Sequence, residues 1–307
     1  MTPKIEAIAL LTNFRGESAA LGAACLWAIS SAIYGRLGQQ IAPLYLNLLK
    51  GAIAIALIIV TLLVRGELLP EISTNNLCLL LLSGAVGIGL GDTAFFAALN
   101  CLGARRALLM ETLAPPITAI IALIFLQESP SAGAWLGIIL TVLGVAWVVT
   151  ERVSDIANYP LRLKAGIIYG AIAAFALAIG GVLARAALVD TSISPLWAAL
   201  LRIIAGVLSL VLWILLKRPA NNFAPKPFSF SFLAGLSFAA FAGTYLGIWL
   251  QQSAIKFTAV GIALTLTNTA PLFVLPIAAW SGEKLSQRAI YGAIIAIAGI
   301  STIFYLR

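Results

Sequence analysis

The sequence predicts an all-α integral membrane protein with ten transmembrane helices, built as two inverted five-helix repeats. Three observations lead to this fold class. Hydrophobic residues make up 62% and charged residues 10% of the chain, whereas a soluble domain has about 25% charged residues. The apolar residues fall into runs of about 20, the length at which a helix spans a bilayer. Finally, a long stretch from about Ala104 to Val149 recurs from about Ala259.

Short polar turns separate the expected helices. The spanning length of about 20 apolar residues places them roughly at 18–38, 43–64, 76–100, 104–126, 133–150, 164–188, 194–216, 229–253, 258–280 and 288–306. The turns between them hold the Gly, Pro, Asn and Ser residues that end helices. The fifth and tenth helices are expected to pack the bundle or to pair two copies of the chain.

The repeat keeps a constant register. Pro116 aligns with Pro271 and Glu128 with Glu283, and both pairs differ by 155 positions (283 − 128). The last helix of each half carries a matching pair of glycines in the same register. Because each half has five helices, an odd number, the halves must enter the membrane from opposite sides, as in many transporters. The charged connector between the fifth and sixth helices predicts a boundary near residue 157, and hence repeats at 1–157 and 158–307.

Composition excludes several classes of function. The net charge of +8 comes from basic residues that sit singly in turns, so we expect no nucleic-acid partner. The chain has no histidine and no motif of the Gly-x4-Gly-Lys type, and its three cysteines show no metal spacing. We therefore expect neither an enzyme nor a bound cofactor or metal. Lysine and arginine are more frequent in the loops on the side opposite the two termini. The positive-inside rule makes those loops cytoplasmic, which would place both termini outside the cell.

The chain resembles the EamA family of the drug/metabolite transporter superfamily over nearly its whole length. The residues that carry the resemblance are Lys50 and Arg202 in the second helix of each half, together with the prolines, turn glutamates and helix glycines described above. The resemblance implies a ten-helix carrier of small metabolites in the cell membrane, often an exporter of amino acids or related compounds. It also implies cytoplasmic termini, opposite to the charge count.

Ionisable residues within spanning helices are costly and point to function. Lys50, Asp92 and Glu111 lie on three helices of the first half, and the helical rise of about 1.5 Å per residue places them at a similar depth. If they meet, one carboxylate pairs with Lys50 and the other can take up a proton, as a proton-coupled carrier requires. The alternative is a structural Lys50–Glu111 pair, with Asp92 facing a polar crevice.

Arg202 has no acidic residue within the helices of its own half. Its guanidinium is therefore a candidate ligand for a substrate carboxylate, or for backbone carbonyls. The ninth helix contains the polar run TLTNTAP, with Thr265 and Asn268 near the membrane midplane. Pro271 and its repeat mate Pro116 each remove a backbone donor at matching places, which is the best sequence indication of a transport site.

Four further side chains could line that site, although aromatic residues in helices more often pack in the core; they are Trp27, Tyr245, Trp249 and Gln251. Glu128 and Glu283 are expected to cap a following helix or pair with a nearby basic residue, with gating as the alternative.

These observations predict a secondary transporter that works by alternating access. Its expected partners are a small-molecule substrate, the lipid bilayer and protons as coupling ions, in a monomer or homodimer. The leading substrates are amino acids, related zwitterions or organic acids, moved out of the cell. A sugar-phosphate or nucleotide-sugar exchanger is the alternative carrier, and a channel or scaffold is the alternative of another class.

Overall fold

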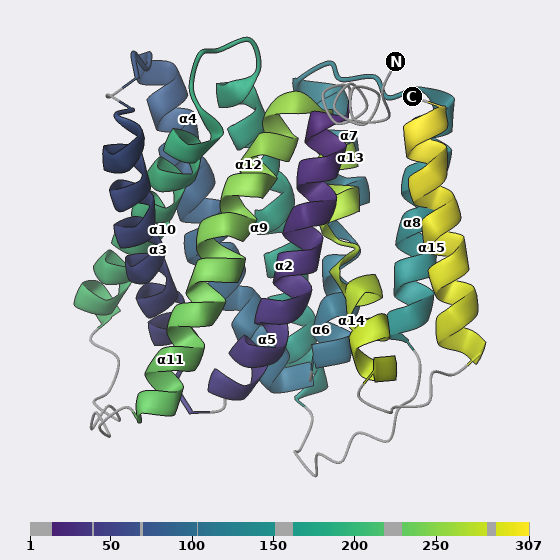
Figure 1. Cartoon of the computed structure of the whole chain (residues 1–307), viewed down its shortest axis with the longest axis horizontal. Helices are drawn as coiled ribbons and strands as arrows, with labels where there is room; N and C mark the ends of the chain where they lie inside the picture. Colours follow the sequence, from purple (N-terminus) through teal and green to yellow (C-terminus); the bar gives the residue numbers. More distant parts are fainter. Residues whose placement is uncertain are drawn as a thin grey trace.

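The computed structural model describes residues 14–38, 40–67, 70–102, 104–150, 162–217, 229–280 and 287–306. These residues form helices joined by turns, and no strand occurs among them. The helices run side by side in a bundle (Figure 1). The predicted boundary near residue 157 and Glu283 lie outside the described residues, so the division at 157 stays a prediction.

The first half contributes five spanning segments. They are formed by α2 (Arg15–Leu37), α3 (Pro43–Arg65), the composite α4 (Thr74–Gly84), η1 (Ala85–Asp92) and α5 (Thr93–Leu102), the broken pair α6 (Ala104–Glu111) and α7 (Ala114–Phe125), and α8 (Ala132–Val149).

The second half repeats this order. Its segments are α9 (Leu163–Leu188), α10 (Pro195–Lys217), the composite α11 (Phe230–Ala239), η2 (Ala240–Leu246) and α12 (Gly247–Phe257), the broken pair α13 (Val260–Thr267) and α14 (Ala270–Trp280), and α15 (Gln287–Tyr305).

Nine segments of the described chain are long and apolar enough to cross a membrane, and the broken α13–α14 pair supplies a tenth apolar segment. The predicted all-helical membrane fold is therefore confirmed. The third segment, Thr74–Leu102, extends beyond the predicted 76–100 at both ends, and the eighth, Phe230–Phe257, extends beyond the predicted 229–253 at its C-terminal end. Both contain a π-helical stretch that the sequence analysis did not predict.

The fourth and ninth segments are broken where the sequence places its prolines. A two-residue turn separates α6 from α7, and another separates α13 from α14. Pro115 and Pro116 lie in the first turn of α7, and Pro271 is the second residue of α14. Proline is favoured in a first helical turn because the N–H that it lacks would have no partner there. Each proline thus starts a new half-helix.

The predicted glycine faces bring helices into close contact. A Cβ added to Gly144 would lie 2.4 Å from the backbone nitrogen of Ala296, and one added to Gly299 would lie 2.5 Å from that of Thr141. These glycines hold α8 and α15 together as a pair at one edge of the bundle (Figure 1). The expectation that these two helices have a packing role is confirmed.

Candidate functional site

A buried salt bridge joins the second and third segments of the first half. Lys50 Nζ lies 2.5 Å from Asp92 Oδ2, and the Lys50 side chain is only 7% exposed. The ammonium also lies 5.1 Å from the ring centre of Phe96 and 5.8 Å from that of Tyr34. Aromatic faces at this distance favour a cation. Among the described residues, Lys50 pairs with Asp92, so the alternative pairing with Glu111 is wrong.

Glu111 ends α6 and is partly buried. Asp92 and Lys50 both act on it electrostatically, although no ion pair of Glu111 occurs among the described residues. The three first-half charges therefore lie near one another, and Glu111 is the carboxylate that has no cation bonded to it. Thr112, the next residue, begins the break between α6 and α7.

Arg202 lies on α10, in the second half, and is 2% exposed. Its Nε and Nη1 atoms are buried and have no hydrogen-bond partner within the described chain. Asp92, in the first half, is the charged residue that acts on its guanidinium. Gly84 and Gly87 allow this approach, because a Cβ on Gly87 would lie 3.1 Å from Nη2 of Arg202. The sequence analysis found no acidic residue for Arg202 within its own half and did not predict this association across the halves.

Asp92 is thus the centre of a group of four charges, which we call the charge cluster: Lys50, Asp92, Glu111 and Arg202. It holds two cations and two carboxylates, and both halves of the chain contribute to it. Groups with paired and unpaired charges inside a membrane bundle can hold a charged substrate or a proton.

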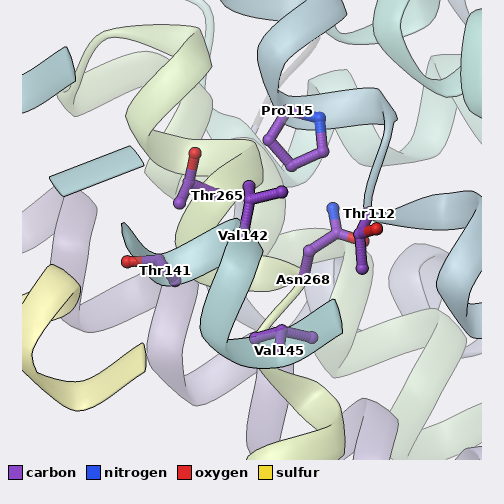
Figure 2. Close-up of a pocket in the computed structure, with 7 residues that line it drawn as sticks. All are labelled: Thr112, Pro115, Thr141, Val142, Val145, Thr265 and Asn268. Carbon is purple, nitrogen blue, oxygen red and sulfur yellow. The ribbon is translucent and has the colours of Figure 1, made fainter. Parts of the chain in front are cut away.

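The two helix breaks meet in a small crevice (Figure 2). Thr112 and Pro115 come from the first break, and Thr265 and Asn268 from the second. Helix α8 completes the lining with Thr141, Val142 and Val145. In Figure 2 the side chains of Asn268 and Thr112 lie next to each other. The structure therefore brings together the two proline-interrupted stretches that the repeat singled out.

The polar side chains of this crevice donate to their own helices. Asn268 Nδ2 donates to Leu264 O at 2.9 Å, and Thr265 Oγ1 donates to Gly261 O at 2.7 Å. The hydroxyl of Thr265 then offers only oxygen lone pairs to a ligand, whereas Asn268 keeps a second amide hydrogen besides its carbonyl oxygen. Because Thr112 directly follows Glu111, the crevice adjoins the charge cluster along the chain.

The other four predicted residues lie elsewhere. Trp27 donates through Nε1 to Gly243 O at 2.7 Å, and Tyr245 shares a 2.8 Å hydrogen bond with a threonine hydroxyl of α3. Trp249 stacks near Tyr245, with ring centres 6.0 Å apart, and Gln251 is buried. None of the four lines the crevice, and three of them contribute to the packing of α12 and η2.

A second polar network, here called the end network, lies where α2 and α13 begin, in the upper part of Figure 1. Glu128 Oε1 accepts from Arg185 Nε at 2.5 Å, and Glu128 Oε2 accepts from the backbone N–H of Val260 at 3.0 Å. Arg185 also donates to the carbonyls of Ile255 and Lys256. Glu128 therefore pairs with a basic residue as expected, but it caps α13 rather than the next helix.

Sequence reasoning missed several residues around these sites. Asn47, one turn before Lys50 on α3, donates to Ile88 O at 2.8 Å. Tyr34 and Phe96 flank Lys50, and Arg185 completes the end network. Asn47 could have been found, because a polar residue inside an apolar helix requires a partner. The aromatic residues carry no such signal.

Comparison with known proteins agrees with this architecture. The sequence profile described as the EamA-like transporter family matches residues 14–150 and again 164–305. The chain is 25% identical over 258 residues to the uncharacterized transporter YyaM of Bacillus subtilis (strain 168), covering 82% of this chain and 81% of that protein. A solved crystal structure with 17% sequence identity superposes with a TM-score of 0.75, covering 95% of this chain and 97% of the other.

Proposed function

The chain belongs to the EamA-like transporter family, and from this premise we propose that it is a secondary transporter that moves small zwitterions or organic acids out of the cell by alternating access. Its multi-pass bundle surrounds a buried set of charges that no lipid-facing role explains. Amino acids and related compounds are the leading substrates. We place the protein in the cell membrane, with the two repeats at 1–157 and 158–307 as its moving parts.

The observation that carries the proposal is the charge cluster. A zwitterion needs a cation for its carboxylate and an anion for its ammonium group. Arg202 offers two buried nitrogens that have no hydrogen-bond partner among the described residues, and a guanidinium binds a carboxylate in a bidentate manner. Asp92 and Glu111 supply the negative charge. A substrate bound between them would touch both halves, as alternating access requires.

Proton coupling rests on Glu111. Lys50 neutralises Asp92 directly, whereas Glu111 forms no ion pair with the described residues. With Lys50 and Arg202 charged, a proton on Glu111 leaves the charge cluster with one excess positive charge. A substrate carboxylate would neutralise that charge, and a substrate ammonium group would compete with the proton. The cluster thus links the substrate's charge to the proton.

Alternating access also requires an end that opens and closes. The end network joins Glu128 of the first half to Arg185 and Val260 of the second. Glu17 of α2 adds a further link between the halves, accepting from Thr258 Oγ1 at 2.9 Å. We propose that these bonds close this end of the bundle and break when it opens. Pairing of two copies through α8 and α15 is part of the same proposal.

Isotope counterflow in proteoliposomes tests the function. Vesicles loaded with unlabelled amino acids, polyamines or organic acids are given the labelled compound, for the wild type and for Arg202→Lys. We expect carboxylate-bearing compounds to exchange, and Arg202→Lys to reduce their exchange because lysine loses the bidentate geometry. Arg288→Lys, at an exposed position of α15, is the matched control. Exchange of polyamines alone, or undiminished exchange in Arg202→Lys, would overturn the assignment.

A further inference from the structure

Two π-helical segments occupy matching positions in the two halves. Segment η1 begins at Ala85 and η2 begins at Ala240, so their first residues lie 155 positions apart (240 − 85), the offset that relates the proline breaks. A π-helical turn is rare and marks functional sites more often than other helical turns. Its recurrence at one register, in two sequences as different as AVGIGLGD and AFAGTYL, indicates that the fold requires it.

Each π-helical segment is held by a side-chain donor at the same position. Asn47 Nδ2 donates to the carbonyl of Ile88 at 2.8 Å, and Trp27 Nε1 donates to the carbonyl of Gly243 at 2.7 Å. Ile88 and Gly243 are again 155 positions apart (243 − 88). The two donors differ in residue type and come from different helices, α3 and α2. The two hydrogen bonds therefore reach the same register position without the repeat having kept the donor residue.

The first segment positions the charge cluster. Asp92 is the last residue of η1, and Lys50 lies one helical turn after Asn47 on α3, so both face the same segment. Asn47 also donates to Thr93 Oγ1 at 3.0 Å. Helix α3 thus contacts η1 at the Ile88 carbonyl, at the Asp92 carboxylate and just beyond its end.

The second segment is held by the other half of the protein. The Tyr34 hydroxyl and Thr244 Oγ1 lie 2.9 Å apart, and the Tyr245 hydroxyl lies 2.8 Å from Thr61 Oγ1. Trp27 also packs closely just beyond this segment, where a Cβ on Gly247, the first residue of α12, would lie 2.6 Å from its Nε1. The contacts of η2 to α2 and α3 are therefore contacts between the two halves.

We propose that the two π-helical segments are paired hinges, at which the third span of each half rewinds during transport, and that Asn47 and Trp27 are the positioning residues that hold them in the π form. When a π turn converts to an α turn, the helix that follows shifts by one residue, which is a rotation of about 100° and a translation of about 1.5 Å along the axis. Such a rotation carries Asp92 away from Lys50. The inference goes beyond the proposed function in assigning where the bundle changes shape, and it rests on that function for its effect on transport.

Hydrogen–deuterium exchange in lipid nanodiscs tests the hinges directly. Trp27→Phe keeps the ring and removes the N–H, and Asn47→Leu keeps the size and removes the amide. We expect exchange about tenfold faster at 240–246 in the first variant and at 85–92 in the second, the effect of one lost hydrogen bond on a local opening. Trp147→Phe, at an exposed position of α8, is the control and leaves both segments unchanged.

A transport measurement separates positioning from simple stability. We expect each variant to change the counterflow turnover about fivefold or more, while the apparent KM stays within about twofold of the wild type, because Asn47 and Trp27 control a conformational step and are not members of the charge cluster. Unchanged exchange in both segments, or faster exchange spread over all spans, would overturn the inference. If the wild type moves no substrate, the proposed function fails, and the exchange result alone decides the hinges.

Discussion

The pair formed by Glu128 and Arg185 gives the most direct energetic prediction. The side chain of Glu128 is 15% exposed and that of Arg185 is 14% exposed, and their closest atoms are 2.5 Å apart. Removing one partner of a buried pair costs about 3–5 kcal/mol. Arg185 retains its two carbonyl bonds in Glu128→Gln, so we expect this variant to lower the free energy of unfolding by about 2–3 kcal/mol.

The assay is reversible unfolding in mixed detergent micelles, applied to Glu128→Gln, Arg185→Gln and the double variant. We expect a coupling energy of about 2 kcal/mol between the two positions. The Arg65–Glu67 pair is the matched control. Its arginine side chain is 50% exposed, so Glu67→Gln should cost less than about 1 kcal/mol. A Glu128→Gln variant no less stable than Glu67→Gln would refute the reasoning.

Further predictions follow from packing, from a hydrogen bond and from the salt bridge of Lys50. Gly144→Ala places a Cβ against α15 and should lower the free energy of unfolding by about 1–3 kcal/mol. A Cβ at Gly35 meets no neighbouring atom, so Gly35→Ala should raise the free energy of unfolding by about 0.5–1 kcal/mol. The same unfolding assay measures both variants. Tyr245→Phe removes a hydroxyl bond to α3 and should cost about 1 kcal/mol, and an unchanged stability would contradict it. Lys50→Met leaves Asp92 without its cation and should abolish counterflow, which Lys50→Arg should partly retain.

Much of the fold could be predicted because apolar length and internal repetition are local signals. The repeat register placed Pro116 and Pro271 at matching breaks, and the structure brings these breaks together. The depth argument placed Lys50 and Asp92 at one level, and they form a salt bridge. Each of these results needs only the helical rise and the order of helices along the chain.

The contacts between the halves could not be predicted in this way. Arg202 has no acidic residue in the helices of its own half, and Asp92, the carboxylate that acts on it electrostatically, belongs to the other half. The bond from Trp27 to Gly243 joins residues 216 positions apart, and no periodicity links them. The π-helical segments also leave no pattern, because GAVGIGLGD reads as a close-packing glycine face, whether its turns are α or π. Three-dimensional packing selects between the two.

The central claim is that the charge cluster binds substrate and proton together, and one measurement tests it most directly. Proteoliposomes that hold a pH-sensitive dye receive the compounds that exchange in counterflow, with the wild type, Glu111→Gln and the exposed control Glu71→Gln. The account predicts a substrate-dependent pH change in the wild type and the control, lost in Glu111→Gln while counterflow persists. Counterflow without a pH change in the wild type, or an undiminished pH change in Glu111→Gln, would contradict it.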